Sequence, residues 1–92
     1  MIIALDFDGT YTEDPEFWNL VIAAAACRSH EVIVATMRHD HEMEGERQKL
    51  ERAGVSRVIC TGRKAKMRFL EERGIRPDVW IDDQPMFLFQ GG

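Results

Sequence analysis

The stretch Met1-Ile-Ile-Ala-Leu-Asp-Phe-Asp-Gly-Thr10 decides how the rest of the chain is interpreted. Its apolar run, residues 2–5, is too short for a convincing helix and suits a buried strand. Two carboxylates, Asp6 and Asp8, follow where the run stops. A buried strand that ends in acidic residues carries them to the carboxyl edge of an open sheet, where such sheets bind ligands. We therefore expect a ligand site at the end of the first strand.

The pairing of these two acids predicts a cation. Two like charges held side by side and shielded from water raise the free energy of the folded chain. A bound divalent cation removes this repulsion, and carboxylate oxygens are ligands that suit Mg²⁺. The sequence therefore predicts that Mg²⁺ is the cofactor of this site.

The composition describes a small domain with an acidic surface. The 92 residues, of which 45% are hydrophobic, predict a single domain over residues 1–92 with a real core. The formal net charge of −4 argues against broad electrostatic binding to nucleic acids or acidic membranes, although it leaves room for a local basic patch.

Features of targeting and redox chemistry favour the cytoplasm. No apolar run reaches the length of a transmembrane span, and no secretory signal is visible, so we expect no membrane association. Cys27 and Cys60 match no zinc spacing. They are expected to be small buried residues in a reducing compartment.

Apolar runs alternate with helical patterns along the chain. Strands are expected at residues 2–6, 31–36, 55–60 and 78–81, with a last short strand at 86–89. Helices are expected at residues 15–29, 41–53 and 63–73. In the first helix, Asp14 should cap the free N–H groups and Pro15 should occupy the first position. Helical spacing predicts that its buried side chains are Phe17, Leu20, Val21 and Ala24.

This alternation predicts an α/β fold, a minimal Rossmann-like parallel sheet flanked by helices. One helix fills each connection, so there is no room for an inserted cap domain and the site should be open. One edge of so small a sheet would need cover from a partner chain, which favours a homo-oligomer.

Four short motifs end at the carboxyl edge of the predicted sheet. They are Leu5-Asp6-Phe7-Asp8-Gly9-Thr10, Val34-Ala35-Thr36, a lysine near a helix start (Lys64 or Lys66), and Ile81-Asp82-Asp83. A lone threonine or lysine would be weak evidence, but the ordered set of four is specific. In this set the chain resembles the haloacid dehalogenase (HAD) superfamily of phosphohydrolases, and the resemblance covers almost the whole chain.

The resemblance implies an enzyme that forms an aspartyl-phosphate. Asp6 would be the nucleophile. Asp8 would protonate the leaving oxygen and later take a proton from the hydrolytic water. Thr36 would bind the transferring phosphoryl group, and a lysine would offset negative charge. We favour Lys64 over Lys66 for this role because it lies nearer the expected helix N-terminus.

The resemblance also implies the contacts to metal and substrate. Mg²⁺ would be bound by Asp6, the carbonyl of Asp8 and Asp82, with Asp83 as a further ligand, directly or through water. Substrate contacts would come from the main chain near Phe7, the tight turn at Gly9, the neighbouring Thr10, and Arg38. An open site admits a phosphorylated small molecule, a nucleotide or an exposed phosphate on a macromolecule.

Two other functions compete with a phosphatase. A non-catalytic module of the same fold would bind a phosphate group or a partner without hydrolysis, and the absent cap motivates this alternative. A response-regulator receiver also combines acids, a threonine and a lysine. It places its phospho-accepting aspartate after the third strand, where this chain has Cys60-Thr61, so we disfavour it.

Overall fold

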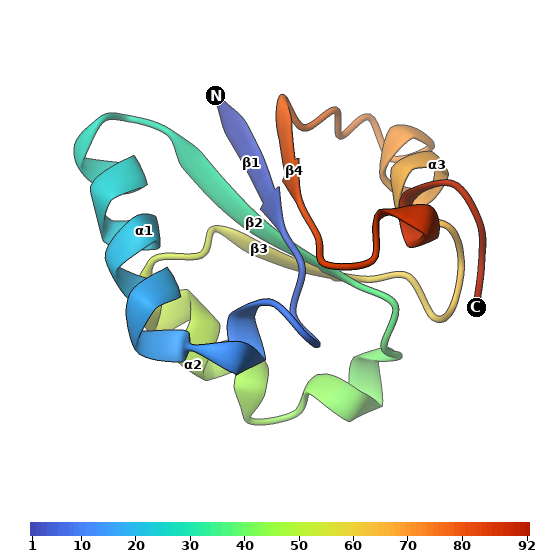
Figure 1. The fold of residues 1–92 in the computed structure, drawn as a ribbon, viewed down its shortest axis with the longest axis horizontal. Coiled ribbons are helices and arrows are strands. Elements are labelled where there is room, and N and C mark those ends of the chain that lie inside the picture. The colour runs from blue at the N-terminus through green and yellow to red at the C-terminus, as the bar shows by residue number, and fades with distance from the viewer.

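Residues 1–92 are all described by the computed structural model, whose centre is a four-stranded sheet (Figure 1). All the strand pairs are parallel, and the spatial order is β3-β2-β1-β4. The strands are β1 (Ile2–Leu5), β2 (Glu31–Thr36), β3 (Arg57–Cys60) and β4 (Val79–Ile81). This architecture confirms the predicted α/β fold with a minimal Rossmann-like parallel sheet. Because the strands are parallel, their carboxyl ends share one edge.

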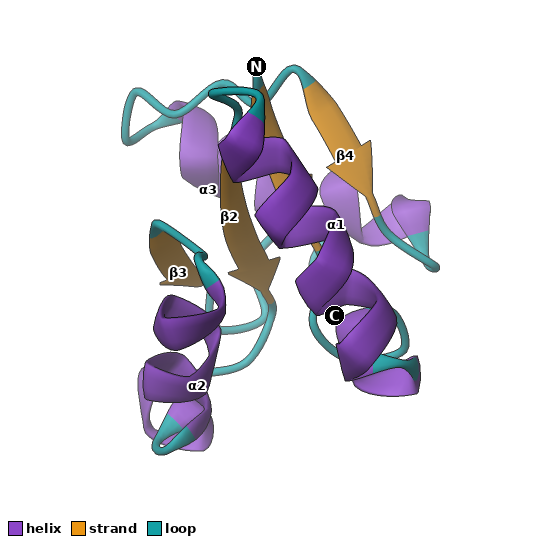
Figure 2. Ribbon diagram, turned by 90° about the vertical axis from the view of Figure 1, so that its left-hand side faces the viewer, coloured by secondary structure: helices purple, strands orange, loops and turns teal.

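Helices cover both faces of the sheet. Helices α1 and α2 lie on one face and α3 lies on the other (Figure 1), and Figure 2 shows α1 and α2 in front of the strands. The helices are α1 (Pro15–Cys27), α2 (Glu46–Ala53) and α3 (Lys66–Glu71), and the 3₁₀ turns are η1 (Tyr11–Glu13), η2 (Asp40–Met43) and η3 (Pro85–Leu88). Only η1 and α1 separate β1 from β2, and only η2 and α2 separate β2 from β3. None of the helices combines the length and the apolar character needed to cross a membrane.

The core has two parts, one on each face of the sheet. Side chains alternate between the faces of a strand, so Val32 and Val34 join the larger cluster while Ile33 and Ala35 join the smaller one. The larger cluster packs against α1 and α2, and the smaller one packs against Leu70 of α3. The non-alternating apolar run of β2 is therefore explained by burial on both faces.

The start of α1 is as predicted. The N–H of Phe17 donates a hydrogen bond to Asp14 Oδ1 at 3.2 Å, and Pro15 occupies the first turn. Asp14 thus satisfies one of the free N–H groups at the helix start, and the fixed φ of proline suits the first position.

The buried face of α1 differs from the predicted one. Phe17 and Leu20 are 51% and 72% exposed, whereas Ile22 and Ala25 are buried and Trp18 packs against the core. Both sets of residues follow helical spacing, and α1 is apolar almost all round, so periodicity alone does not choose between them. The rotation of the helix is set instead by tertiary contacts.

The later elements are shorter than predicted. Gly45, at φ +80°, separates η2 from α2 within the single helix expected at 41–53. The expected strand at 86–89 is wrong, since η3 lies there. Pro85 fixes φ and suits the first position of a helical turn. This turn buries Leu88 and leaves Met86 and Phe89 exposed.

The two cysteines are less buried than predicted. Cys27 is exposed at the end of α1, and Cys60 is half-buried at the end of the edge strand β3. Burial raises the pKa of the Cys60 thiol. Both thiols are free.

Candidate functional site

Apart from the lysine, which follows β3, the predicted site residues follow three neighbouring strands. Strand β1 pairs with β2 on one side and with β4 on the other, and Leu5 is in register with both Val34 and Ile81. Asp6 therefore leaves the sheet between the ends of β2 and β4. A cavity of about 440 Å³ opens at this edge, and its lining includes Asp6, Asp8, Thr36, Lys66, Asp82 and Asp83.

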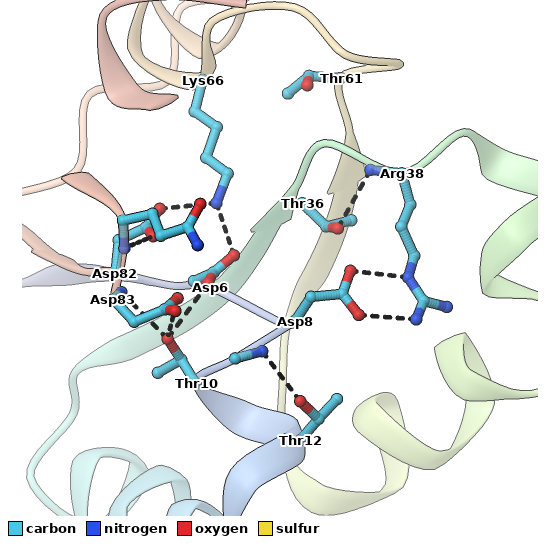
Figure 3. Close-up of polar contacts among 12 residues, drawn as sticks. Asp6, Asp8, Thr10, Thr12, Thr36, Arg38, Thr61, Lys66, Asp82 and Asp83 are labelled. Carbon is cyan, nitrogen blue, oxygen red and sulfur yellow. Dashed lines mark hydrogen bonds and ion pairs between the residues drawn. The ribbon is translucent and has the colours of Figure 1, made fainter. Parts of the chain in front are cut away.

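Lys66 joins two of the carboxylates. Its Nζ donates hydrogen bonds to Asp6 Oδ1 at 2.6 Å and to Asp82 Oδ2 at 2.7 Å (Figure 3). The exposed fractions of the Lys66, Asp6 and Asp82 side chains are 3%, 8% and 3%. Buried charges of this kind are tolerated only when they are paired, so the ammonium is required for both acids to sit here.

The preference for Lys64 is thereby corrected. The Lys64 ammonium lies 6.0 Å from the ring centroid of Phe69 and makes no contact with Asp6. The expected helix start at 63 was too early, because the Thr61 hydroxyl donates to the Lys64 carbonyl at 2.7 Å and holds a turn that delays α3 until Lys66. The rule that the lysine should lie at the helix start holds, but it selects Lys66.

Thr10 links Asp6 to a third carboxylate, that of Asp83. The Thr10 hydroxyl lies 3.2 Å from Asp6 Oδ2 and 3.1 Å from Asp83 Oδ1, so it can donate to either. The N–H of Asp83 donates to Thr10 Oγ1 at 3.3 Å. Thr10, which was expected beside the substrate, is instead buried and holds Asp6 and Asp83 through hydrogen bonds.

Glycine is the residue type that fits position 9. Its φ of +82° lies in the left-handed region, and a Cβ there would stand 2.5 Å from Asp83 Oδ2. Glycine therefore lets the turn after β1 and the turn after β4 approach each other.

Three of the predicted acids converge. One carboxylate oxygen each from Asp6, Asp82 and Asp83 lie within 4.8 Å of one another. A single ammonium, that of Lys66, stands against these three carboxylates, which leaves excess negative charge. An all-oxygen donor set with this charge suits a hard divalent cation, so the residues present fit the expected Mg²⁺.

The acids of the cluster shift each other's protonation. Burial raises the pKa of Asp6 to about 7, although Lys66 opposes the shift, and a hydrogen bond with Asp83 and the charge of Asp82 add to it. The hydrogen bond with Asp6 lowers the pKa of Asp83. Near neutral pH Asp6 is therefore shared between its two protonation states while no cation is present.

Asp8 lies apart from this cluster. Arg38 binds it in a bidentate ion pair, with Nε donating to Oδ2 at 2.8 Å and an Nη donating to Oδ1 at 2.7 Å (Figure 3). The guanidinium also donates to the carbonyl of Glu42 at 2.9 Å and lies 4.9 Å from the ring centroid of Phe7. The Asp8 carboxylate is therefore not one of the converging metal ligands, although the predicted role of its carbonyl is untouched by this.

Thr36 lines the cavity, whereas the side chain of Phe7 belongs to the core beneath it. Thr36 is 1% exposed, and its Oγ1 accepts a hydrogen bond from the N–H of Arg38 at 3.2 Å. The ring of Phe7 is buried and stacks on Tyr11 at a centroid distance of 5.8 Å, so only its main chain is free to meet a ligand. The main-chain N–H groups of Phe7 and Asp8 have no acceptor within the chain.

Sequence reasoning missed two parts of this site. It did not predict that Arg38 pairs with Asp8, because the residues lie 30 positions apart and only the adjacency of β1 and β2 joins them. It also gave no role to Thr12, whose Oγ1 accepts a hydrogen bond from the N–H of Gly9 at 3.0 Å. A threonine two positions after Gly9-Thr10 was the available signal.

Comparisons with known proteins give no further identification. A scan against protein-family models, a search of curated proteins and a search of solved structures each found no match.

Proposed function

We propose that this chain is a Mg²⁺-dependent phosphohydrolase of the HAD type that cleaves phosphomonoesters through an aspartyl-phosphate on Asp6. One observation carries the proposal: the buried ammonium of Lys66 bridges Asp6 and Asp82 within a cluster of three carboxylates. Buried charges cost free energy that a purely structural edge of a sheet has no reason to incur. Perturbed titratable groups in a cavity are typical of catalytic sites.

The metal and the phosphoryl group would share this edge. Asp6, Asp82 and Asp83 would hold Mg²⁺, which when bound supplies positive charge that neutralises the carboxylates and the substrate phosphate. The free N–H groups of Phe7 and Asp8 are available as donors to phosphate oxygens. Phosphoryl transfer depends mainly on such positioning and charge stabilisation.

In the first step Asp6 acts as nucleophile. One of its carboxylate oxygens attacks phosphorus while the bond from phosphorus to the ester oxygen breaks, which yields an aspartyl-phosphate. Asp8 gives a proton to the departing oxygen, so the product leaves as an alcohol. Lys66 fixes the orientation of Asp6 through its bond to Oδ1.

In the second step water regenerates the enzyme. The deprotonated Asp8 takes a proton from a water molecule whose oxygen attacks phosphorus. The bond from phosphorus to Asp6 breaks, inorganic phosphate leaves, and the carboxylate of Asp6 and the acid form of Asp8 are restored. Both carboxyl groups thus return to their starting states.

The openness of the site bears on its substrate. The cavity of about 440 Å³ has no inserted domain above it in the connections after β1 and β2. It would admit a phosphorylated small molecule, a nucleotide or an exposed phosphate on a macromolecule. We place the enzyme in the cytoplasm, where the free thiols Cys27 and Cys60 would stay reduced.

The test is a phosphatase screen on wild type and Asp6→Asn together. With Mg²⁺, wild type should release phosphate from an aryl phosphate and from members of a phosphomonoester panel, and both EDTA and Asp6→Asn should abolish the release. Absence of turnover across the panel would refute the enzyme. Binding of phosphate esters without turnover would favour the non-catalytic module instead.

A further inference from the structure

The arrangement of Asp8 conflicts with the role proposed for it. A general acid must face the leaving oxygen, yet both carboxylate oxygens of Asp8 accept hydrogen bonds from Arg38 at 2.7 and 2.8 Å. Figure 3 shows this carboxylate turned toward Arg38, while Asp6 points toward Lys66. In this arrangement both oxygens of Asp8 act as acceptors, so neither is placed to give a proton to a substrate.

Arg38 is itself held firmly. The remaining nitrogen of its guanidinium, Nη1, donates to the carbonyl of Glu42 at 2.9 Å, and its main-chain N–H donates to Thr36 Oγ1 at 3.2 Å. The guanidinium also lies over the ring of Phe7. Arg38 is not itself part of the cavity lining, but it contacts two residues that are, Asp8 and Thr36, so its fork lies next to the cavity. A guanidinium held in this way is preorganised to bind two oxygens of one anion.

We propose that Arg38 is a substrate-binding residue that holds Asp8 in a resting arrangement and exchanges it for the phosphoryl group of the substrate. The inference rests on the proposed function. A phosphate monoester offers the same pair of oxygens as a carboxylate and carries more negative charge, so it competes for the fork. Once displaced, the half-exposed Asp8 side chain takes up a proton from solvent and turns toward the leaving oxygen, to which it gives that proton.

The exchange would keep the open site inactive until a substrate binds. Asp8, the general acid, stays bound to Arg38 until a phosphate is present. The phosphate of the substrate is then the anion that displaces Asp8 from Arg38. Arg38 thereby links substrate binding to assembly of the catalytic groups, without a lid or an inserted domain.

A crystal structure of the wild-type chain with Mg²⁺ and orthovanadate tests the exchange directly. We expect vanadate within hydrogen-bond distance of the Arg38 guanidinium, and the Asp8 carboxylate turned away from Arg38 and toward the vanadate. Vanadate beside Asp6 with the Arg38–Asp8 pair intact would overturn the exchange alone. Failure of any oxyanion to bind at this edge would overturn the proposed function, and the exchange with it.

Kinetics on an alkyl phosphate give a second test. Asp8→Asn should lower kcat by about 10²–10⁴-fold, as for loss of a general acid. Arg38→Met should raise KM by about tenfold or more, the weight of a charged hydrogen bond, without the loss of kcat seen in Asp8→Asn. Arg38→Lys should recover part of the KM, since lysine binds phosphate as a point charge.

The matched control is Arg47→Met. Arg47 also binds an aspartate, Asp40 at 3.0 Å, and a carbonyl, that of Val58 at 2.8 Å. Neither of these partners lines the cavity, whereas Asp8 and Thr36, which Arg38 contacts, do. Its substitution should leave KM unchanged. If Arg38→Met lowers kcat as much as Asp8→Asn does, or leaves KM at the wild-type value, the exchange is wrong. The vanadate structure gives its answer even if Arg38→Met does not fold.

Discussion

Replacing Lys66 by methionine tests the electrostatics of the site without reference to activity. The substitution keeps most of the side-chain volume and removes the one charge that compensates Asp6 and Asp82, which its Nζ contacts at 2.6 and 2.7 Å. Breaking a buried ion pair by removing one partner typically costs about 3–5 kcal/mol. Small domains are stable by only about 5–15 kcal/mol, so the loss should be large.

The assay is urea unfolding in EDTA at about pH 8, where Asp6 of the wild type is mostly ionised given its pKa of about 7. Lys66→Met should lower the free energy of unfolding by about 3–5 kcal/mol. The deficit should shrink as the pH falls, beginning above pH 7, because loss of Lys66 raises the pKa of Asp6 further and protonation of Asp6 removes one of the two uncompensated charges. Mg²⁺ should stabilise Lys66→Met more than wild type, since it supplies the missing positive charge.

The control is Lys49→Met. Lys49 is 71% exposed and pairs with Glu46 only at 3.9 Å, so its loss should change the free energy of unfolding by less than about 0.5 kcal/mol. Equal stability of Lys66→Met and Lys49→Met in EDTA at alkaline pH would refute the argument that Lys66 compensates buried carboxylates.

Three further predictions concern the turn after β1, the titration of the site and the cap of α1. Gly9→Ala should lower the melting temperature more than Gly74→Ala does. Both positions have positive φ, which costs alanine about 1–2 kcal/mol each, but only a Cβ at residue 9 meets Asp83, whereas residue 74 has open space. Equal losses of melting temperature would contradict the close approach of residue 9 to Asp83. In EDTA, the contribution of Asp6 to the free energy of unfolding of the wild type should be greatest below its unfolded pKa of 3.8 and be lost as the pH rises through about 7, since the folded pKa is raised. In urea unfolding, Asp6→Asn should lack this loss. If the free energy of unfolding of both proteins changed with pH in the same way, the raised pKa of Asp6 would be contradicted. Asp14→Ala should cost about 1 kcal/mol in urea unfolding through loss of the cap, and an unchanged midpoint would show that the cap contributes nothing.

The parts of the fold that follow from local physics were predictable. The uninterrupted apolar run at 32–35 is typical of a strand buried on both faces, and Asp14-Pro15 is typical of a helix start. The alternation of strands and helices then predicted the parallel sheet and the shared edge. The strand order β3-β2-β1-β4 did not follow, since alternation alone does not say which strands are neighbours.

The errors arose where a choice between local alternatives depends on tertiary contacts. Helix α1 is apolar almost all round, so the burial of Ile22 rather than Leu20 depends on how the helix docks. The choice of Lys66 over Lys64 depends on a turn in which Arg63 takes φ +73°, a conformation that no pattern at this position announces. The pairing of Arg38 with Asp8 needs the adjacency of β1 and β2, which sequence spacing does not contain.

The shortest strand carries a disproportionate share of the site. Strand β4 has three residues, borders only β1 and is followed directly by Asp82 and Asp83. Segments with few buried apolar contacts open most readily in native proteins, and none of the three residues of β4 is fully buried. Detachment of β4 would withdraw both carboxylates in a single event while Asp6 and Thr36 stayed anchored on the central strands. Cation uptake should therefore slow hydrogen exchange at Val79–Ile81 more than in β2, because a cation bound by Asp6, Asp82 and Asp83 would tie the end of β4 to the end of β1.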